Sequence, residues 1–146
     1  MIVKPAFTTL KSNYQLNKTH DCKMHFPNTC AIRMSEALVK TNPRFLDAFK
    51  SSKKNVCPHG YMRGAQDLAA VLSGPRVFGQ RDDGWSAQSD GTAPAGVRGV
   101  KGIVCYMNIP DFDGQGHIDL WDGEGLVGNA DDNYWDAQTI WLWKLP

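Results

Sequence analysis

An α+β fold is predicted for this chain of 146 residues, because its two halves differ in hydrophobic periodicity. The front half carries apolar residues at helical spacing, up to about residue 72. The back half, from residue 102 onward, carries continuous and alternating apolar runs that are typical of strands. The sequence therefore predicts one domain spanning residues 1–146, in which N-terminal helices pack on a small antiparallel sheet.

The front half contains three predicted helices. The first begins at Cys30, where apolar side chains recur on one helical face through Leu38, and Asn28 and Thr29 are expected to cap it. The second follows Asn42 and a proline, and the third covers residues 61–72 before a Gly-Pro pair ends it. A short helix within the first twenty residues is also compatible with the pattern.

Residues 76–99 are rich in Gly, Asp, Ser and Gln, and they separate the two halves. A long connection of this kind can hold a short strand and part of a substrate groove, and a disordered insert is the alternative. Three strands are then predicted at residues 102–107, 116–121 and 134–145, in meander order.

Composition excludes several classes of partner. Sixteen basic and fifteen acidic residues leave a formal charge of +1, which gives no electrostatic basis for binding nucleic acid or an anionic membrane. No segment approaches the roughly 18 apolar residues that a membrane span requires. The N-terminus also lacks the apolar core of a secretory signal. We therefore expect no membrane insertion, and export only by a machine that needs no such signal.

Cys30 is the first candidate for catalysis. A thiol in the first turn of a helix lies at the positive end of the helix dipole, which favours the thiolate and lowers the pKa. Such a cysteine is suited to nucleophilic attack. The alternative is a small buried apolar residue that happens to begin a helix.

His117 is the candidate proton-transfer partner, because a thiolate nucleophile needs a base near neutral pH. It begins the predicted strand GHIDLW behind Gly114 and Gly116, whose small size lets another backbone or a substrate approach. Alternation places His117, Asp119 and Trp121 on one face of that strand. A cysteine at a helix start followed much later by a strand histidine is the order found in papain-like folds.

A third group should orient the imidazole ring of His117. The segment after the histidine strand offers four aspartates, and spacing does not decide among them. Asp122 lies in an Asp-Gly pair and is expected to form a turn. Asp136 is expected on the returning strand, and Asp131 and Asp132 lie in the loop before it.

The other cysteines allow a disulfide or a metal site. Cys105 lies in an apolar run and is expected in the core, whereas Cys22 and Cys57 can pair in an oxidising compartment. A structural zinc site is another interpretation of the cysteines and the nearby histidines. The potential ligands are His20, Cys22, His25, Cys57 and His59. Their spacings match no common zinc pattern, so no metal or other cofactor is expected.

Five motifs in this order resemble a known family: NTCAIRMSEAL, GYMRGAQDLAAVL, KGIVCYMN, GQGHIDLWDG and YWDAQTIWLWKLP. The chain, from about residue 26 onward, is similar to the type VI secretion amidase effectors of the fourth family, which are papain-like, NlpC-type cysteine amidases. The resemblance implies an antibacterial toxin that is injected into the periplasm of a competing cell. There it would cleave the bond between γ-D-glutamate and meso-diaminopimelate in peptidoglycan stem peptides, and an immunity protein would protect the producer.

The resemblance also implies roles for individual residues. Cys30 matches the nucleophile, His117 the general base and acid, and Asp131 best matches the third member of the triad, with Asp132 and Asp136 as alternatives. Some members flank this aspartate with a cysteine pair, for which this sequence has Asn129 and Asn133. Two other functions remain open: a housekeeping NlpC-type cell-wall hydrolase, and a non-enzymatic zinc-stabilised binding domain.

Overall fold

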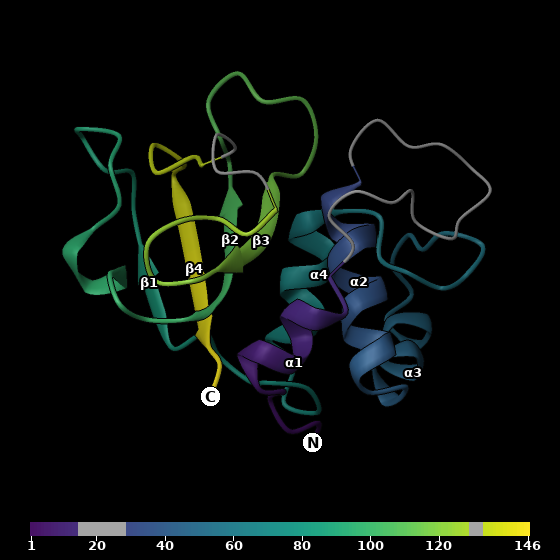
Figure 1. The fold of residues 1–146 in the computed structure, drawn as a ribbon. Coiled ribbons are helices and arrows are strands. Elements are labelled where there is room, and N and C mark those ends of the chain that lie inside the picture. Colours follow the sequence, from purple (N-terminus) through teal and green to yellow (C-terminus); the bar gives the residue numbers. More distant parts are fainter. Residues whose placement is uncertain (15–28, 129–132) are drawn as a thin grey trace.

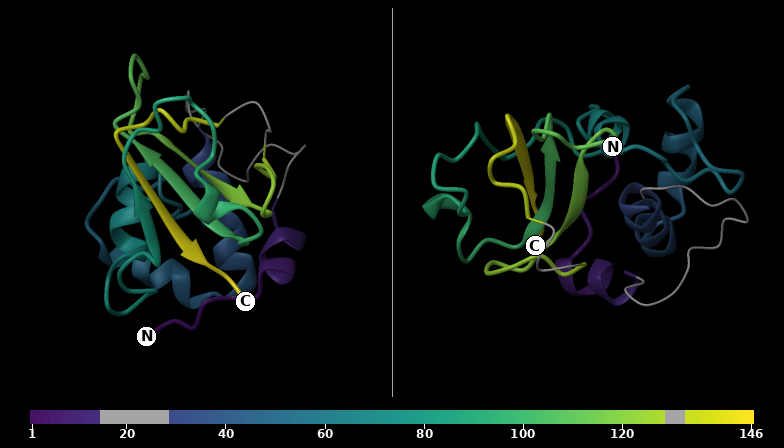
Figure 2. Two further views of the ribbon diagram at one scale, coloured as in Figure 1. Left: turned by 90° about the vertical axis from the view of Figure 1, so that its left-hand side faces the viewer. Right: turned by 90° about the horizontal axis from the view of Figure 1, so that it is seen from above.

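The structure is a computed structural model that describes residues 1–14, 29–128 and 133–146. In the described part, four α-helices lie on one side of a four-stranded antiparallel sheet (Figure 1). The two views in Figure 2 show the same separation of helices from strands. The predicted α+β class, with N-terminal helices packed on a small antiparallel sheet, is therefore confirmed.

The helices begin close to their predicted positions. Their bounds are Phe7–Ser12 for α1, Cys30–Thr41 for α2, Arg44–Ser51 for α3 and Ala65–Leu72 for α4. Asn42 accepts a hydrogen bond from the Arg44 amide at 3.0 Å and so acts as the predicted cap of α3. Thr29, by contrast, makes no side-chain cap on α2, so the prediction was wrong for this residue, and Asn28 lies outside the described residues.

Helix α4 is shorter than predicted, because Tyr61 does not belong to it. The chain before α4 forms a turn at Gly60, and Tyr61 packs with Ile32 and Cys57 in a small separate cluster. Gly64 then precedes the first residue of the helix in an extended conformation. The apolar spacing from Tyr61 to Leu72 therefore joins two different local structures.

The sheet contains β1 (Asp83–Trp85), β2 (Gly102–Met107), β3 (His117–Trp121) and β4 (Thr139–Lys144) in the order β1-β4-β2-β3. The predicted meander order was wrong, because β4 pairs with β2 rather than with β3. Every residue of β2 is buried, and the strand has a partner on both sides. The Trp- and Ile-rich β4 provides the second partner and leaves β3 at the edge of the sheet.

The sheet packs on both faces. Ile103, Cys105 and Ile118 face the helices, together with apolar residues of all four helices. Val104 and Tyr106 face the opposite side, which is covered by connecting segments. Edge strand β3 also contacts α2, which brings the start of the cysteine helix beside the histidine strand.

The segment of residues 76–99 contributes to this second layer. It contains β1 and a short 3-10 helix, Ala95–Val97, and Val97 is fully buried in the second core. The predicted short strand is confirmed, and the segment is an ordered part of the fold rather than a disordered insert. Over the described ranges, no helix combines the length and apolarity that crossing a bilayer would demand.

Candidate active site

Cys30 is the first residue of α2 and is largely buried, with 8% of its surface exposed. Its Sγ lies 3.9 Å from the carbonyl oxygen of Gly116, at the start of β3. Since the Thr29 side chain does not cap the helix, it does not occupy the first-turn N–H groups beside the thiol. The predicted position of the cysteine at a helix N-terminus is confirmed.

Gly116 allows the backbone of β2 to come close to the start of β3. Its φ is +125°, and a Cβ atom there would lie 2.1 Å from the carbonyl oxygen of Tyr106 on β2. A side chain at this position would therefore separate the two strands at the point where His117 begins β3. The expectation that small residues before His117 admit a neighbouring backbone is confirmed at Gly116.

The structure brings His117 and Cys30 together although they are distant in sequence. The His117 side chain hydrogen-bonds the Cys30 side chain and, through Nε2, lies 3.3 Å from Oδ2 of Asp119. Burial opposes protonation of the imidazole, but the hydrogen bonds and negative charge of Asp119 and Cys30 outweigh it. Together they raise the pKa of His117 to about 9.

Asp119 lies two residues after His117 on the same face of β3, and only 1% of its surface is exposed. The face was predicted, but sequence analysis did not consider Asp119 as a partner of the imidazole. The His-x-Asp alternation was the available signal, since residues i and i+2 of a strand lie side by side. Among the described residues, Asp119 is the carboxylate that contacts His117.

Two tyrosine rings pack against the imidazole. Tyr106 pairs with His117 across the strands and stacks on it at 6.3 Å between centroids, with an interplanar angle of 10°. Tyr134 meets the same imidazole edge to face at 5.7 Å. These contacts restrict rotation of the ring, and neither tyrosine was singled out from the sequence.

The four aspartates considered from the sequence have different outcomes. Asp131 and Asp132 lie outside the described residues. Asp122 accepts hydrogen bonds from the amides of Glu124 and Gly125, both at 2.8 Å, and so forms the predicted turn. Asp136 is exposed in a turn before β4, so the prediction that it lies on the returning strand was wrong.

The other described cysteines are in the core or in a disulfide bond. Cys105 is fully buried with a free thiol, as predicted, and burial raises its pKa. Cys57 is disulfide-bonded. Cys22, His20 and His25 lie outside the described residues. A disulfide sulfur does not supply a thiolate to zinc, and the described ranges hold no cluster of three potential metal ligands.

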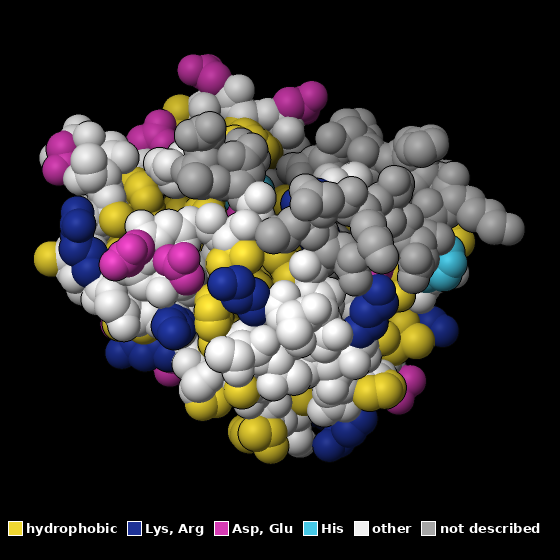
Figure 3. Space-filling model, viewed as in Figure 1, with side chains coloured by type: hydrophobic (Ala, Val, Ile, Leu, Met, Phe, Trp, Pro, Cys, Tyr) yellow, Lys and Arg dark blue, Asp and Glu magenta, His cyan; other side chains and the backbone are white. Residues whose placement is uncertain are grey.

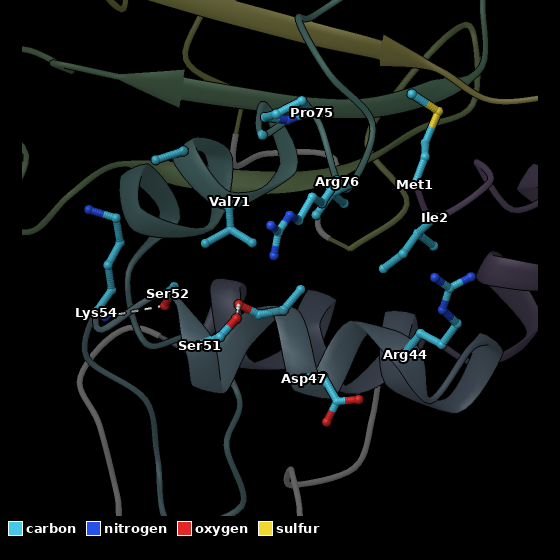
Figure 4. A pocket seen from close by; sticks show the side chains of 14 residues that line it. Met1, Ile2, Arg44, Asp47, Ser51, Ser52, Lys54, Val71, Pro75 and Arg76 are labelled. Atoms are coloured by element: carbon cyan, nitrogen blue, oxygen red, sulfur yellow. Dashed lines mark hydrogen bonds between the residues drawn. The ribbon is translucent and has the colours of Figure 1, made fainter.

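Two cavities, of about 760 and 770 Å³, lie away from the candidate active site, because neither Cys30 nor His117 lines them. The first lies between α3 and the end of α4, and its lining includes Arg44, Asp47, Val71 and Arg76 (Figure 4). Acidic and basic side chains are scattered over the face drawn in Figure 3.

Comparison with known proteins identifies the family. Residues 26–143 match the family model described as type VI secretion system amidase effector protein 4, or Tae4. No curated protein matches the chain by sequence.

The solved structures of Tae4 effectors share the fold. Tae4 from Enterobacter cloacae is 21% identical over all of both chains, with a TM-score of 0.73. Tae4 from Salmonella Typhimurium, solved in complex with the immunity protein Tai4, is 21% identical over 99% of this chain and all of the other, with a TM-score of 0.75. The family model covers most of the chain, so this protein belongs to the Tae4 family of type VI secretion peptidoglycan amidase effectors.

Proposed function

We propose that this effector is a cysteine amidase that hydrolyses the γ-D-glutamyl–meso-diaminopimelate bond of peptidoglycan stem peptides. The observation that carries the proposal is the hydrogen bond between the side chains of Cys30 and His117, at the junction of α2 and β3. A thiol hydrogen-bonded to an imidazole is the pair of nucleophile and proton carrier that a cysteine amidase requires.

In the proposed reaction, the Cys30 thiolate attacks the amide carbonyl and forms a tetrahedral oxyanion. The backbone N–H of Cys30 at the start of α2 is the proposed donor to that oxyanion. The His117 imidazolium then gives its proton to the leaving amine of diaminopimelate. Finally, His117 takes a proton from water, the resulting hydroxide attacks the acyl-enzyme, and the γ-D-glutamyl carboxylate leaves the regenerated Cys30.

Asp131, which best matches the family's third triad position, stays a prediction together with its alternative Asp132. Both can be tested by substitution with asparagine. Asp136 is exposed, and its position in a turn does not favour the same role.

We also propose that the effector acts in the periplasm of a target bacterium after delivery by the type VI apparatus. Residues 1–146 would act as a single amidase domain. The Enterobacter and Salmonella Tae4 proteins have been solved with the immunity protein Tai4. A cognate immunity protein that blocks access to Cys30 is the corresponding proposed partner of this effector.

Digestion of purified sacculi tests the proposed dyad. Cys30→Ala and His117→Ala should each abolish digestion, because the first removes the nucleophile and the second the proton carrier. Cys105→Ala is the matched control, since it makes the same substitution at a fully buried thiol of β2 that is not part of the dyad. It should retain activity.

A Cys30→Ala protein that still digests sacculi would exclude this mechanism. Membership of the type VI effector family counts against the housekeeping alternative. The zinc-domain alternative predicts stoichiometric zinc in the purified protein, and it also requires a thiolate from Cys57, which the disulfide withholds.

A further inference from the structure

We propose that Asp119, on the same strand as His117, positions the catalytic imidazole. The inference rests on the proposed function, because it assigns a role relative to the Cys30–His117 dyad. It differs from the loop aspartate Asp131 that the family resemblance implies.

The geometry of β3 places the two side chains together. His117 and Asp119 are consecutive residues on one face of an edge strand, and Nε2 lies 3.3 Å from Oδ2. Because Nε2 faces Asp119, the other ring nitrogen is the one available to Cys30. This arrangement specifies both the orientation and the tautomer that a cysteine amidase needs.

The carboxylate is itself held by three donors. Its Oδ1 accepts hydrogen bonds from the amide of Leu120 at 2.7 Å, the amide of Gly128 at 2.9 Å and the hydroxyl of Tyr14 at 3.0 Å. Burial and the nearby Asp119 charge raise the pKa of Tyr14, so its hydroxyl stays protonated and continues to donate. All three donors bind Oδ1, which leaves Oδ2 for the imidazole.

Gly128 shows that the chain makes room for this carboxylate. A Cβ atom at Gly128 would lie 2.5 Å from Oδ2 of Asp119 and 2.8 Å from Oδ1. Only glycine therefore lets the backbone after β3 come close enough to donate to Asp119 while leaving its other oxygen on His117. This fit is a second reason, independent of the His117 distance, to assign Asp119 a specific function.

Several titratable or charged groups lie around the pair formed by the His117 imidazole and the Asp119 carboxylate. They are Cys30 from α2, Tyr106 from β2, Tyr134 before β4 and Tyr14 after α1, with Arg33 acting on Tyr14. Within residues 1–14, 29–128 and 133–146, Asp119 is the carboxylate that contacts the imidazole. Its replacement should therefore change the imidazole titration more than a replacement elsewhere.

Asp119→Asn is the direct test, because the amide keeps the shape and one acceptor but loses the charge. With a soluble stem peptide as substrate, we expect kcat to fall about 10²- to 10⁴-fold while KM changes by less than about threefold. By NMR, the imidazole titration should move down from about 9 toward 6.5. Alkylation of Cys30 by iodoacetamide near pH 6, followed by mass spectrometry, should slow at least about tenfold.

Two further variants complete the experiment. Gly128→Ala keeps the carboxylate but crowds it, so it should shift the titration in the same direction, and it tests the proposal even if Asp119→Asn does not fold. Asp122→Asn is the matched control, because it makes the same chemical change in the turn after β3 and should leave all three measurements unchanged.

An Asp119→Asn protein with kcat within threefold of wild type and an unmoved His117 titration would overturn the assignment. Loss of activity in Asp131→Asn with a shifted titration, and no shift in Asp119→Asn, would assign the role to the loop instead. If the wild-type protein does not cleave the stem peptide, the proposed function fails. The titration and alkylation measurements would still decide whether Asp119 positions His117.

Discussion

The properties of His117 result from residues contributed by four parts of the chain. Cys30 and Asp119 hydrogen-bond the imidazole, whereas Tyr106 and Tyr134 pack against its ring. A histidine in these surroundings is buried without losing its charge, because hydrogen bonds to two acidic groups outweigh the cost of desolvation. The site therefore stores a proton that the leaving amine can accept.

The raised pKa makes folding stability depend on pH. The pKa of His117 is about 9 in the folded protein and 6.5 for an unperturbed histidine, so its protonation favours the folded state. This contribution is fully present below pH 6.5 and is lost as pH rises through about 9. We predict that the free energy of unfolding, measured with urea, falls by up to about 3 kcal/mol over this interval.

His117→Gln provides the control for that measurement, since the remaining groups titrate in both proteins. The difference between wild type and the variant should decrease steadily from pH 6.5 to 9. A difference that stays constant over this interval would show that the imidazole is not held protonated in the folded state.

At the residue scale, sequence analysis identified the reacting pair and missed its surroundings. Cys30 and His117 carry chemistry that stands out in a linear pattern. Tyr14 and Gly128 gain their roles only because the fold brings them to Asp119, and nothing in their sequence neighbourhood indicates this contact. Asp119 lies on the strand face that alternation predicts, but alternation alone does not show that its carboxylate reaches the imidazole.

At the scale of elements, the approach to β3 is anchored on α4. Oε1 of Gln115 accepts a hydrogen bond from the amide of Asp67 at 2.9 Å, in the first turn of α4. The Gln115 side chain also fills the space beside Gly64, where a Cβ atom would lie 2.1 Å from the same oxygen. The Gln115 side chain therefore caps the N-terminus of α4, although it is distant from this helix in the sequence.

Gln115→Ala should lower the free energy of unfolding by about 1 kcal/mol, because the first turn of α4 loses an acceptor. It should also reduce amidase activity, since the start of β3 loses its anchor. Gln138→Ala, at an exposed position before β4, is the control and should change neither quantity by a measurable amount. Equal stability of the two variants in urea would show that Gln115 does not support the helix.

The limits of the sequence prediction are clearest in the order of the strands. The run at residues 102–107 and the strand at His117 were predictable because burial and alternation leave strong local signals. The pairing of β4 with β2 was not, because either edge of the β2–β3 hairpin was open to a later strand. Because β4 pairs with β2 and not with β3, the strand that carries His117 stays at the edge of the sheet, beside α2.

At the scale of the whole molecule, membership of the Tae4 family implies secretion by a type VI system, and the proposed site of action is the periplasm of another bacterium. The effector should then be toxic in the compartment that contains its substrate. We predict that protein directed to the periplasm of a bacterial host lyses the cells, whereas the same protein kept in the cytoplasm does not. Cys30→Ala directed to the periplasm is the control, and equal toxicity in both compartments would count against the cell wall as the target.

The most direct test of the central claim is mass spectrometry of the fragments released from purified sacculi. The wild-type effector should release fragments with a new diaminopimelate amino terminus and leave stems that end in γ-D-glutamate. Cys30→Ala should release none. Cleavage at another bond, or the same fragments from the Cys30→Ala protein, would contradict the assignment of this chain as a γ-D-glutamyl–diaminopimelate cysteine amidase.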